Sequence, residues 1–181
     1  MAVSKRALIR IGILIVMLLI IGGAIWVLNN PKFQEYPNKM RPVWDVAYNI
    51  QVGSDNTHFA TQINQVGYAT FLHGKGPFTV FVPSDTAYSN LPANDQDLFN
   101  QDQGSLRQAL LYNIVKGSYR LSDLRDGMKL HTIQGDDITV TKKGGSWVLN
   151  GYAYIKAADF ISTNGVIYMT TNYLIPPSLI H

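Results

Sequence analysis

The sequence predicts an α+β domain that follows one transmembrane helix, and three observations indicate this organisation. The first thirty residues contain an uncharged apolar run, the next stretch has the hydrophobic spacing of helices, and the residues after Gly117 alternate as strands do. Helices that precede an antiparallel sheet in the sequence are typical of the α+β class. The 181 residues, 46% of them hydrophobic, suffice for one ordinary domain and an appendage.

The appendage comprises a basic segment, residues 1–10, and an apolar segment, residues 11–28, whose eighteen residues are all uncharged. A helix needs roughly 20 apolar residues to cross the hydrocarbon core of a bilayer, so residues 11–28 predict a transmembrane helix. A secretory signal peptide cleaved after Ala24 is the alternative, but the apolar run continues to Leu28, which favours a retained anchor. We assign to the membrane anchor Ile11, Leu14, Leu18, Ile21, Trp26 and Leu28.

The charges on the two flanks of this segment indicate its orientation. Lys5, Arg6 and Arg10 precede it, while the following flank has mixed charge, so the positive-inside rule predicts a cytoplasmic N-terminus. We therefore expect a single-pass membrane protein whose outer domain, residues 42–178, is periplasmic or extracellular. The span has no small-xxx-small motif, so homo-oligomerisation through it is not favoured.

Residues 29–41, between the span and the domain, predict a linker because they contain two prolines and no apolar periodicity. Thirteen residues of flexible chain span about 20 Å on average, and roughly 45 Å at most when extended. The domain therefore stays near its own bilayer, where tethering raises the effective concentration of neighbouring membrane proteins.

The outer domain begins with two short helices, predicted at 43–50 and 57–66. Polar residues 54–56 supply the cap of the second helix, and Gly67 ends it. No helix is predicted in the loop that follows, residues 73–78.

A strand is predicted at residues 79–82, which have the β-branched and aromatic composition of a strand buried on both faces. Pro83 ends the strand because proline has no N–H to donate to the ladder. Ser84 or Asp85 then caps a short helix. Asp85 has a second interpretation, as a residue that faces a partner, and we favour the cap.

Two further helices are predicted before the sheet. One begins in residues 91–101 with Asn94 or Asp95 as its cap, and Ser105 opens the other, residues 105–115. In the second helix the apolar positions recur at i, i+3 and i+4, and Asn113 follows at i+7, so we expect Asn113 on the buried face.

Strands are predicted at residues 129–133, 137–155 and 166–170. Gly144-Gly145 and Asn150-Gly151 are tight hairpin signals, because both turns need backbone conformations that glycine adopts easily. Asn164-Gly165 marks the turn before the last strand, and Pro176-Pro177 stops the sheet.

Three segments, in their order and spacing, resemble the signature segments of the fasciclin-like domain: GPFTVFVPSDTAYSNLP (76–92), LLYNIVKG (110–117) and NGVIYMTTNYLIPP (164–177). The resemblance implies a wedge of antiparallel β-strands flanked by short helices, in which residues 79–82 pair with residues 166–169. It also implies a protein linked to adhesion and protein binding, with no known reaction. The signature residues, which we expect to be structural, are Thr79, Phe81, Pro83, Asp85, Tyr112, Asn113, Asn164, Gly165, Val166, Tyr168 and Pro176.

The sequence departs from this family at two positions. The family usually has histidine where Asn113 follows Tyr112, and again near Tyr168. Asparagine hydrogen-bonds inside a core but does not titrate near neutral pH, so it cannot take over a role that depends on a titrating histidine.

We expect no catalytic residue, no metal and no cofactor. The chain has no cysteine and no Gly-x-Ser-x-Gly motif, its four histidines lack ligand spacing, and the acidic segment 94–104 lacks the glycine and glutamate of a calcium loop. After residue 41, nine basic residues stand against eleven acidic ones, a net charge of −2. Nucleic acid demands a basic face, so it is not an expected partner.

These observations favour a membrane-anchored, non-catalytic interaction module outside the cytoplasm. We expect it to dock to, or to be an accessory subunit of, an integral-membrane protein complex in the same bilayer, with the N-terminal helix in the lipid. Cell-surface or envelope adhesion is the alternative. The second alternative is an uncharacterised enzyme, which would gather acidic side chains around one cavity from among Asp85, Asp126, Asp136, Asp137 and Asp159.

Overall fold

The computed structural model describes residues 44–180, apart from the side chains of residues 157–159. The predicted N-terminal segment, transmembrane helix and linker lie outside the described residues. Within residues 44–180, no helix combines the length and the apolar character that crossing a membrane requires.

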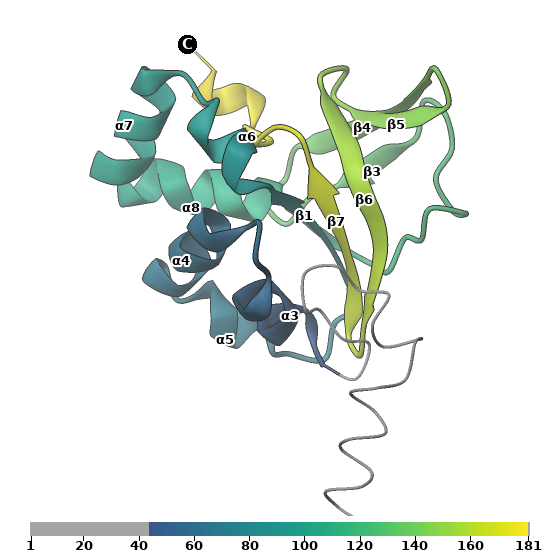
Figure 1. The fold of residues 1–181 in the computed structure, drawn as a ribbon, viewed down its shortest axis with the longest axis horizontal. Helices are drawn as coiled ribbons and strands as arrows, with labels where there is room; N and C mark the ends of the chain where they lie inside the picture. The colour runs from purple at the N-terminus through teal and green to yellow at the C-terminus, as the bar shows by residue number, and fades with distance from the viewer. Residues whose placement is uncertain (1–43, 181) are drawn as a thin grey trace, which may run out of the picture. The chain divides into compact units, whose positions relative to one another are not determined.

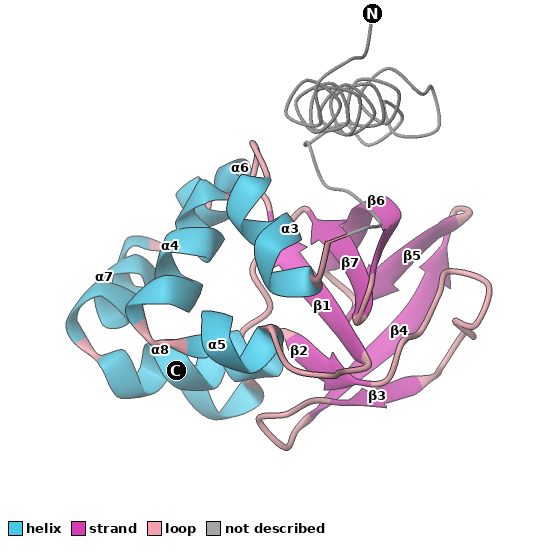
Figure 2. Cartoon of the chain, turned by 90° about the horizontal axis from the view of Figure 1, so that it is seen from below, coloured by secondary structure: helices cyan, strands magenta, loops and turns pink. Residues whose placement is uncertain are grey.

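A group of short helices lies against one side of a curved sheet (Figures 1 and 2). The helices are α3 (Val46–Val52), α4 (Thr57–Gln65), α5 (Tyr68–Leu72), α6 (Asp85–Ser89), α7 (Ala93–Gln101) and α8 (Gln103–Tyr112). The strands are β1 (Phe78–Pro83), β2 (Ile114–Lys116), β3 (Lys129–His131), β4 (Asp137–Lys143), β5 (Ser146–Leu149), β6 (Ala153–Ser162) and β7 (Gly165–Thr170). A 3₁₀ turn, η1 (Pro177–Leu179), follows the last strand.

The strands form one seven-stranded sheet in the order β2-β1-β7-β6-β5-β4-β3. All neighbours are antiparallel except β1 and β7, which run parallel from the pair Phe78–Gly165 to the pair Pro83–Thr170. An isolated bridge between Val115 and Thr132 joins the two edges, so the sheet is nearly closed. The fold class is therefore confirmed, as a wedge of mostly antiparallel strands flanked by short helices. The predicted pairing of residues 79–82 with residues 166–169 is also confirmed.

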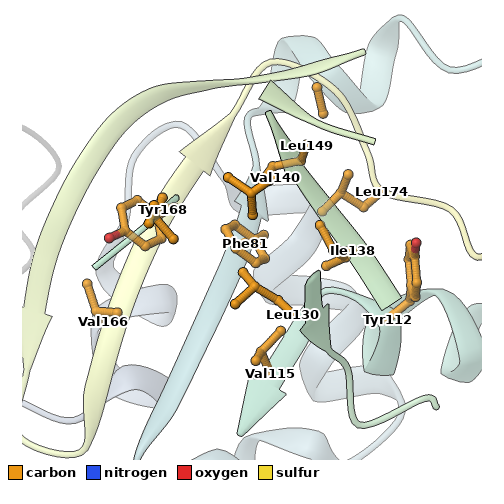
Figure 3. Packing of buried hydrophobic residues seen from close by; sticks show 12 residues of the cluster. Phe81, Tyr112, Val115, Leu130, Ile138, Val140, Leu149, Val166, Tyr168 and Leu174 are labelled. Atoms are coloured by element: carbon orange, nitrogen blue, oxygen red, sulfur yellow. The ribbon is translucent and has the colours of Figure 1, made fainter. Parts of the chain in front are cut away.

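One cluster of the hydrophobic core lies between the strands of this wedge (Figure 3). Phe81 and Tyr168, from the parallel pair, stack with ring centroids 5.7 Å apart at its centre. Both strands of this pair are buried along their whole length, as the composition of residues 79–82 predicts. Further side chains of the core come from strands on both halves of the sheet: Val115, Leu130, Ile138, Val140, Leu149 and Val166.

The hairpin turns lie where their glycines predict them. Gly144 and Gly145 join β4 to β5 with φ angles of +56° and +86°. Asn150 and Gly151 join β5 to β6 with φ angles of +49° and +79°, the left-handed pair that a tight hairpin requires.

Three helix starts differ from the sequence predictions because other residues cap them. Helix α3 begins at Val46 instead of residue 43, since the Asp45 carboxylate accepts from the Tyr48 N–H at 2.8 Å. Helix α8 begins at Gln103, ahead of Ser105, because Asp102 accepts from the N–H groups of Gly104 and Ser105. Helix α7 has Pro92 at its N-cap, and the predicted caps Asn94 and Asp95 lie in its first turn.

Two elements have a secondary structure that the sequence does not predict. The helix predicted to run to residue 115 ends at Tyr112, and residues 114–116 form β2, which pairs with β1. Helix α5 was not predicted; it starts anew after Gly67, whose φ of +79° ends α4. Both outcomes depend on contacts with distant segments, which local periodicity does not register.

Asn113 ends α8 and is fully buried. Its side-chain amide donates to the carbonyl oxygens of Ala109 and Leu174, at 2.8 Å each. Its Oδ1 atom has no hydrogen-bond partner among the described residues. One side chain therefore both ends the helix and attaches the segment after β7 to it.

Replacing Asn113 by Leu should lower the free energy of unfolding by about 1–3 kcal/mol, because the buried Leu174 carbonyl loses its donor. Urea unfolding of the full chain in mild detergent measures this change. The matched control is Gln108→Leu, at an exposed position of the same helix, which should leave stability within about 0.5 kcal/mol. Equal stability of the two variants would contradict a structural role for the Asn113 amide.

Candidate functional site

The parallel direction of β1 and β7 creates two distinct ends of the domain. The segments that follow both strands, α6 to α7 and the C-terminal residues 171–180, lie at one end, which we call the α7 end (Figure 1). The segments that precede both strands lie at the opposite end together with α3 and α5, and we call this the α3 end. Each end carries its own set of exposed side chains.

Two adjoining hollows lie at the α7 end, and together we call them the α7 groove. The larger measures about 430 Å³ and the smaller about 230 Å³. Both are lined by Pro92, Asp95, Ile175 and Ile180, which places them side by side. Ile180, the last described residue, has 62% of its surface exposed and adds an apolar side chain to both hollows. The remaining apolar lining comes from Ala87, Leu91, Leu98, Tyr152 and Tyr173.

Hydrogen bonds hold the C-terminal wall of this groove. The Tyr152 hydroxyl accepts from the Ile175 N–H at 3.3 Å and donates to the Tyr173 carbonyl at 3.5 Å. Tyr173 is buried, and its hydroxyl donates to Gln62 Oε1 at 2.9 Å. Burial raises the pKa of Tyr173 far above its ordinary value, so the hydroxyl stays protonated and remains a donor. The wall of the groove is thus preformed.

The α7 groove combines this apolar lining with unpaired negative charge. The sequence from residue 76 to residue 106 contains four aspartates and no lysine or arginine. Asp85 and Asp102 are engaged at helix N-termini. The carboxylates of Asp95, in the groove, and Asp97, on the same helix, have no hydrogen-bond or ion-pair partner within residues 44–180.

The join between β1 and α6 is built from two caps for two different helices. Ser84 Oγ accepts from the Ala87 N–H at 3.1 Å and caps α6. Asp85 instead accepts from the His58 N–H at 3.0 Å and from the Thr57 hydroxyl at 2.9 Å, both in the first turn of α4. Asp85 is therefore a cap, but of a helix that comes earlier in the chain. Asn56 is the N-cap residue of α4, within the predicted residues 54–56, but its side chain makes no capping hydrogen bond.

The environment of Asp85 favours its ionised form. Partial burial alone raises the pKa of this carboxyl, but the hydrogen bonds from His58 and Thr57 outweigh that effect and hold the pKa below its ordinary value of 3.8. The carboxylate therefore stays charged at neutral pH and ties the start of α4 to the end of β1.

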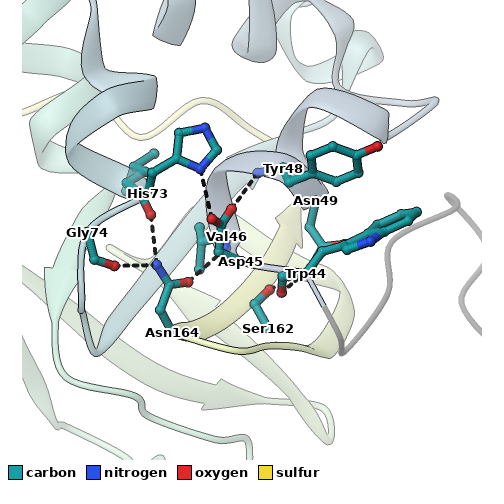
Figure 4. A network of polar contacts seen from close by, with 10 residues as sticks. Trp44, Asp45, Val46, Tyr48, Asn49, His73, Gly74, Ser162 and Asn164 are labelled. Carbon is teal, nitrogen blue, oxygen red and sulfur yellow. Dashed lines mark hydrogen bonds and ion pairs between the residues drawn. The ribbon is translucent and has the colours of Figure 1, made fainter.

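Asn164 ties together the segments of the α3 end (Figure 4). Its Oδ1 accepts from the Val46 N–H at 2.8 Å, and its amide donates to the carbonyls of Leu72 and Gly74 at 2.8 and 2.7 Å. Next to it, the Thr163 N–H donates to the Trp44 carbonyl at 2.9 Å. The first described residue of the chain is thereby fixed to the turn between β6 and β7.

Glycine is required beside this network. A Cβ atom on Gly165 would collide with the Phe78 carbonyl oxygen of the neighbouring strand. Gly76 has a φ of +63°, and a Cβ there would collide with the Asn164 carbonyl oxygen. The close approach of the loop before β1 to the turn before β7 explains both glycines.

The other signature residues lie inside the scaffold and bond to backbone or to the core. The Thr79 hydroxyl donates to the Gly117 carbonyl at 2.7 Å, and the Tyr168 hydroxyl donates to the Tyr119 carbonyl at 2.9 Å. The Tyr112 hydroxyl donates to the Asp137 carbonyl at 3.0 Å, and burial raises the pKa of Tyr112. Phe81 and Val166 lie in the core, Pro83 ends β1, and Pro176 precedes η1.

Of the five aspartates that an enzyme would gather, the four with described side chains do not line the α7 groove. Asp126 accepts from the Lys142 N–H, whereas Asp137 contacts His131 and Lys129, and Asp85 caps α4. The side chain of Asp159 lies outside the description. Among the described residues, no group of three or more histidine, cysteine or acidic side chains has the arrangement to hold a metal ion.

From the sequence, Asp95 is predicted only as a helix cap, and no pattern singles out Tyr152, Ile175 or Ile180. These residues come from three separate segments, so no local motif connects them. The one local signal is the absence of lysine and arginine from residues 76–106, which marks the acidic face.

The family model of the fasciclin domain matches residues 54–176. The transforming growth factor-beta-induced protein ig-h3 of Sus scrofa is 32% identical over 112 residues, which cover 62% of this chain and 16% of that protein. Protein sll1483 of a Synechocystis species is 29% identical over 133 residues, covering 71% of this chain and 73% of that protein. Stabilin-2 of Rattus norvegicus is 33% identical over 111 residues, 60% of this chain and 8% of that protein. The chain thus spans only a small part of the two mammalian relatives.

A solved structure has the same fold. It is a FAS1 domain pair from the insect cell adhesion molecule fasciclin I, with a TM-score of 0.66 and 18% sequence identity. The match covers 76% of this chain and 53% of that one.

Replacing Asp85 by Asn should lower the free energy of unfolding by about 0.5–2 kcal/mol at neutral pH, because α4 loses its charged cap. A carboxyl with a lowered pKa stabilises the fold above its unfolded-state pKa, and this stabilisation is lost as the pH falls through the lower pKa of the folded state. The difference in the free energy of unfolding between the wild type and Asp85→Asn should therefore shrink below pH 3.8, the ordinary pKa of the group.

Urea unfolding in mild detergent at pH 7 and at about pH 3 checks this prediction. Asp97→Asn is the matched control, because the Asp97 side chain is exposed and has no partner within residues 44–180. A difference that stays constant with pH, or that is equal for both variants, would contradict the capping role.

Proposed function

The chain belongs to the fasciclin domain family, and from this premise we propose that it is a non-catalytic interaction module that docks to an integral-membrane protein complex. In this proposal residues 11–28 anchor it in the bilayer, the N-terminus is cytoplasmic, and the domain is periplasmic or extracellular. The docking site is the α7 groove.

The observation that carries this proposal is the composition of the groove. Apolar side chains, including the exposed Ile180, surround a hollow of about 430 Å³, and the carboxylate of Asp95 has no partner within residues 44–180. A binding surface needs apolar anchors for affinity and charges at the rim for orientation. Catalysis would need acids or nucleophiles that converge on one cavity, and the groove contains a single carboxylate.

The partner that fits this groove is a protein segment with apolar side chains next to a lysine or arginine. Burying one side chain of leucine or phenylalanine size contributes roughly 1.5–3 kcal/mol. A cation beside it would meet the carboxylate of Asp95, which has no ion-pair partner within residues 44–180. A second copy of this chain is not favoured as the partner, because two α7 grooves in contact would oppose like charges.

Tethering to the bilayer allows a modest affinity to be sufficient. A flexible linker of thirteen residues spans about 20 Å on average, so the effective concentration of membrane neighbours is in the millimolar range. The tether does not raise the effective concentration of partners on distant surfaces. The length of the linker therefore supports docking within the same membrane.

Adhesion is the second candidate function, and one observation favours it. The solved structure with the same fold comes from a protein described as a cell adhesion molecule. At 18% identity this likeness extends to the fold alone, so adhesion needs its own test.

Purification of the full chain from its native membranes in mild detergent should recover an integral-membrane partner. Asp95→Lys should reduce the yield of that partner at least tenfold, which corresponds to about 1.4 kcal/mol, because it replaces the attracting charge in the groove. Asp136→Lys is the matched control, since it makes the same charge reversal at a half-buried aspartate outside the groove. Quantitative mass spectrometry compares the two yields.

Exchange of residues 11–28 for an unrelated single span separates the domain from the anchor as the source of binding. Retention of the partner supports docking through the domain. Equal yields with Asp95→Lys and Asp136→Lys would exclude the α7 groove. If no membrane protein co-purifies, while cells that lack the protein attach or aggregate differently, adhesion replaces docking.

A further inference from the structure

The α3 end of the domain contains a second hollow, of about 210 Å³, with a basic lining. Lys75 and Arg120 lie on it together with Pro77, Ser118, Thr163 and Asn164. Lys116 lies nearby at the end of β2, where its Cα is paired with that of Phe78. All three cationic side chains are exposed, and none has an ion-pair partner within residues 44–180.

The acidic groups of this end are engaged by neighbours in the domain. The Asp45 carboxylate accepts from the Tyr48 N–H and contacts His73 Nδ1 at 2.8 Å. The Asp123 carboxylate accepts from the Arg120 N–H at 2.8 Å and from the Ser122 hydroxyl at 3.3 Å. Neither Asp45 nor Asp123 forms an ion pair with Lys75, Lys116 or Arg120.

Exposed aromatic side chains lie at the same end. Trp44 and Tyr48 pack with ring centroids 4.5 Å apart on the outside of the start of α3, and Tyr48 is 46% exposed (Figure 4). Phe71, on α5, packs on Phe78 yet remains 40% exposed. Tryptophan and tyrosine next to lysine and arginine are the composition that proteins place at the boundary between a bilayer and water.

The described part of the chain begins at the α3 end of the domain. Trp44 is the first described residue, and its carbonyl is bonded to the turn that lines the basic hollow. Only residues 29–43 separate it from the apolar segment 11–28, and they add three more cations, Lys32, Lys39 and Arg41, against one acid, Glu35. Fifteen residues of flexible chain span about 20 Å.

We propose that the α3 end is a membrane-contact surface that binds the anionic phosphate headgroups of the bilayer through Lys75, Lys116 and Arg120. The aromatic side chains of Trp44, Tyr48 and Phe71 enter the interface beside them. Each lysine or arginine near an anionic surface strengthens binding roughly fivefold. This inference rests on the proposed membrane anchor. It adds to the proposed function which end of the domain faces the bilayer.

The orientation has a consequence for the α7 groove. Strand β1 leads from the α3 end to the α7 end, and its six residues span about 20 Å. With the α3 end on the bilayer, the groove opens at least that far above it. The segment of the partner that enters the groove must then project from the membrane.

The test uses the full chain in lipid nanodiscs, with one spin label attached to Ser118→Cys, because the chain has no native cysteine. Ser118 is exposed and lines the basic hollow. The immobilised fraction of the label should rise at least fivefold when zwitterionic lipid is replaced by a mixture with about 30% anionic lipid, and 0.5 M salt should reverse the rise. In the triple variant K75Q/K116Q/R120Q, the immobilised fraction should rise less than twofold on the same change of lipid.

The matched control K129Q/K142Q/K143Q removes three exposed lysines from β3 and β4 and should respond like the parent chain. Equal unfolding midpoints of both triple variants exclude a folding defect. The proposal would be overturned if the immobilised fraction did not depend on anionic lipid. It would also be overturned if the control K129Q/K142Q/K143Q lost as much of the rise as K75Q/K116Q/R120Q. A rise produced by inorganic phosphate in zwitterionic nanodiscs would also overturn it, in favour of a site for free phosphate.

A flotation assay with zwitterionic vesicles separates this inference from the proposed function. Flotation of the full chain shows insertion through residues 11–28 whether or not the α3 end binds anionic lipid. Failure to float would overturn the anchor itself, and with it the premise of the membrane-contact surface.

Discussion

The parallel pairing of β1 with β7 is the interaction on which the rest of the structure depends. These strands are separated by more than eighty residues, yet they pair over their whole length and every residue of both is buried. A parallel pair brings the segments that follow both strands to one end and those that precede them to the other. The α7 groove and the basic hollow of the α3 end are the two products of this constraint.

Polar residues of the signature segments stabilise this arrangement at both ends of the domain through hydrogen bonds within the scaffold. At the α3 end, the Asn164 side chain binds three backbone groups, one in α3 and two at the end of α5, and Gly165 allows the close approach of β1. At the α7 end, Ser84 and Asp85 cap two different helices directly after β1. Because these polar groups are used inside the scaffold, we propose that recognition depends on other residues around them, such as Asp95 and Ile180 at one end and Lys75 and Arg120 at the other.

Much of the fold could be predicted from local patterns. The buried strand before Pro83 and the left-handed hairpin turns at Gly144-Gly145 and Asn150-Gly151 depend on backbone chemistry that short segments reveal. Strand β2 could not be separated from the helix before it, because Ile114 and Val115 suit either element until β1 supplies hydrogen bonds. The cap that Asp85 provides for α4 and the lining of the α7 groove depend on contacts between distant segments, which no local spacing encodes.

The central claim is that the two ends of the domain face different partners, a protein at the α7 groove and lipid at the α3 end. Photo-crosslinking in native membranes tests it most directly, with a crosslinking amino acid placed at Leu98 in the groove or at Ser118 in the basic hollow. We expect adducts to one membrane protein from Leu98, which Asp95→Lys abolishes, and adducts to lipid from Ser118. Lipid adducts from Leu98 together with protein adducts from Ser118 would contradict it.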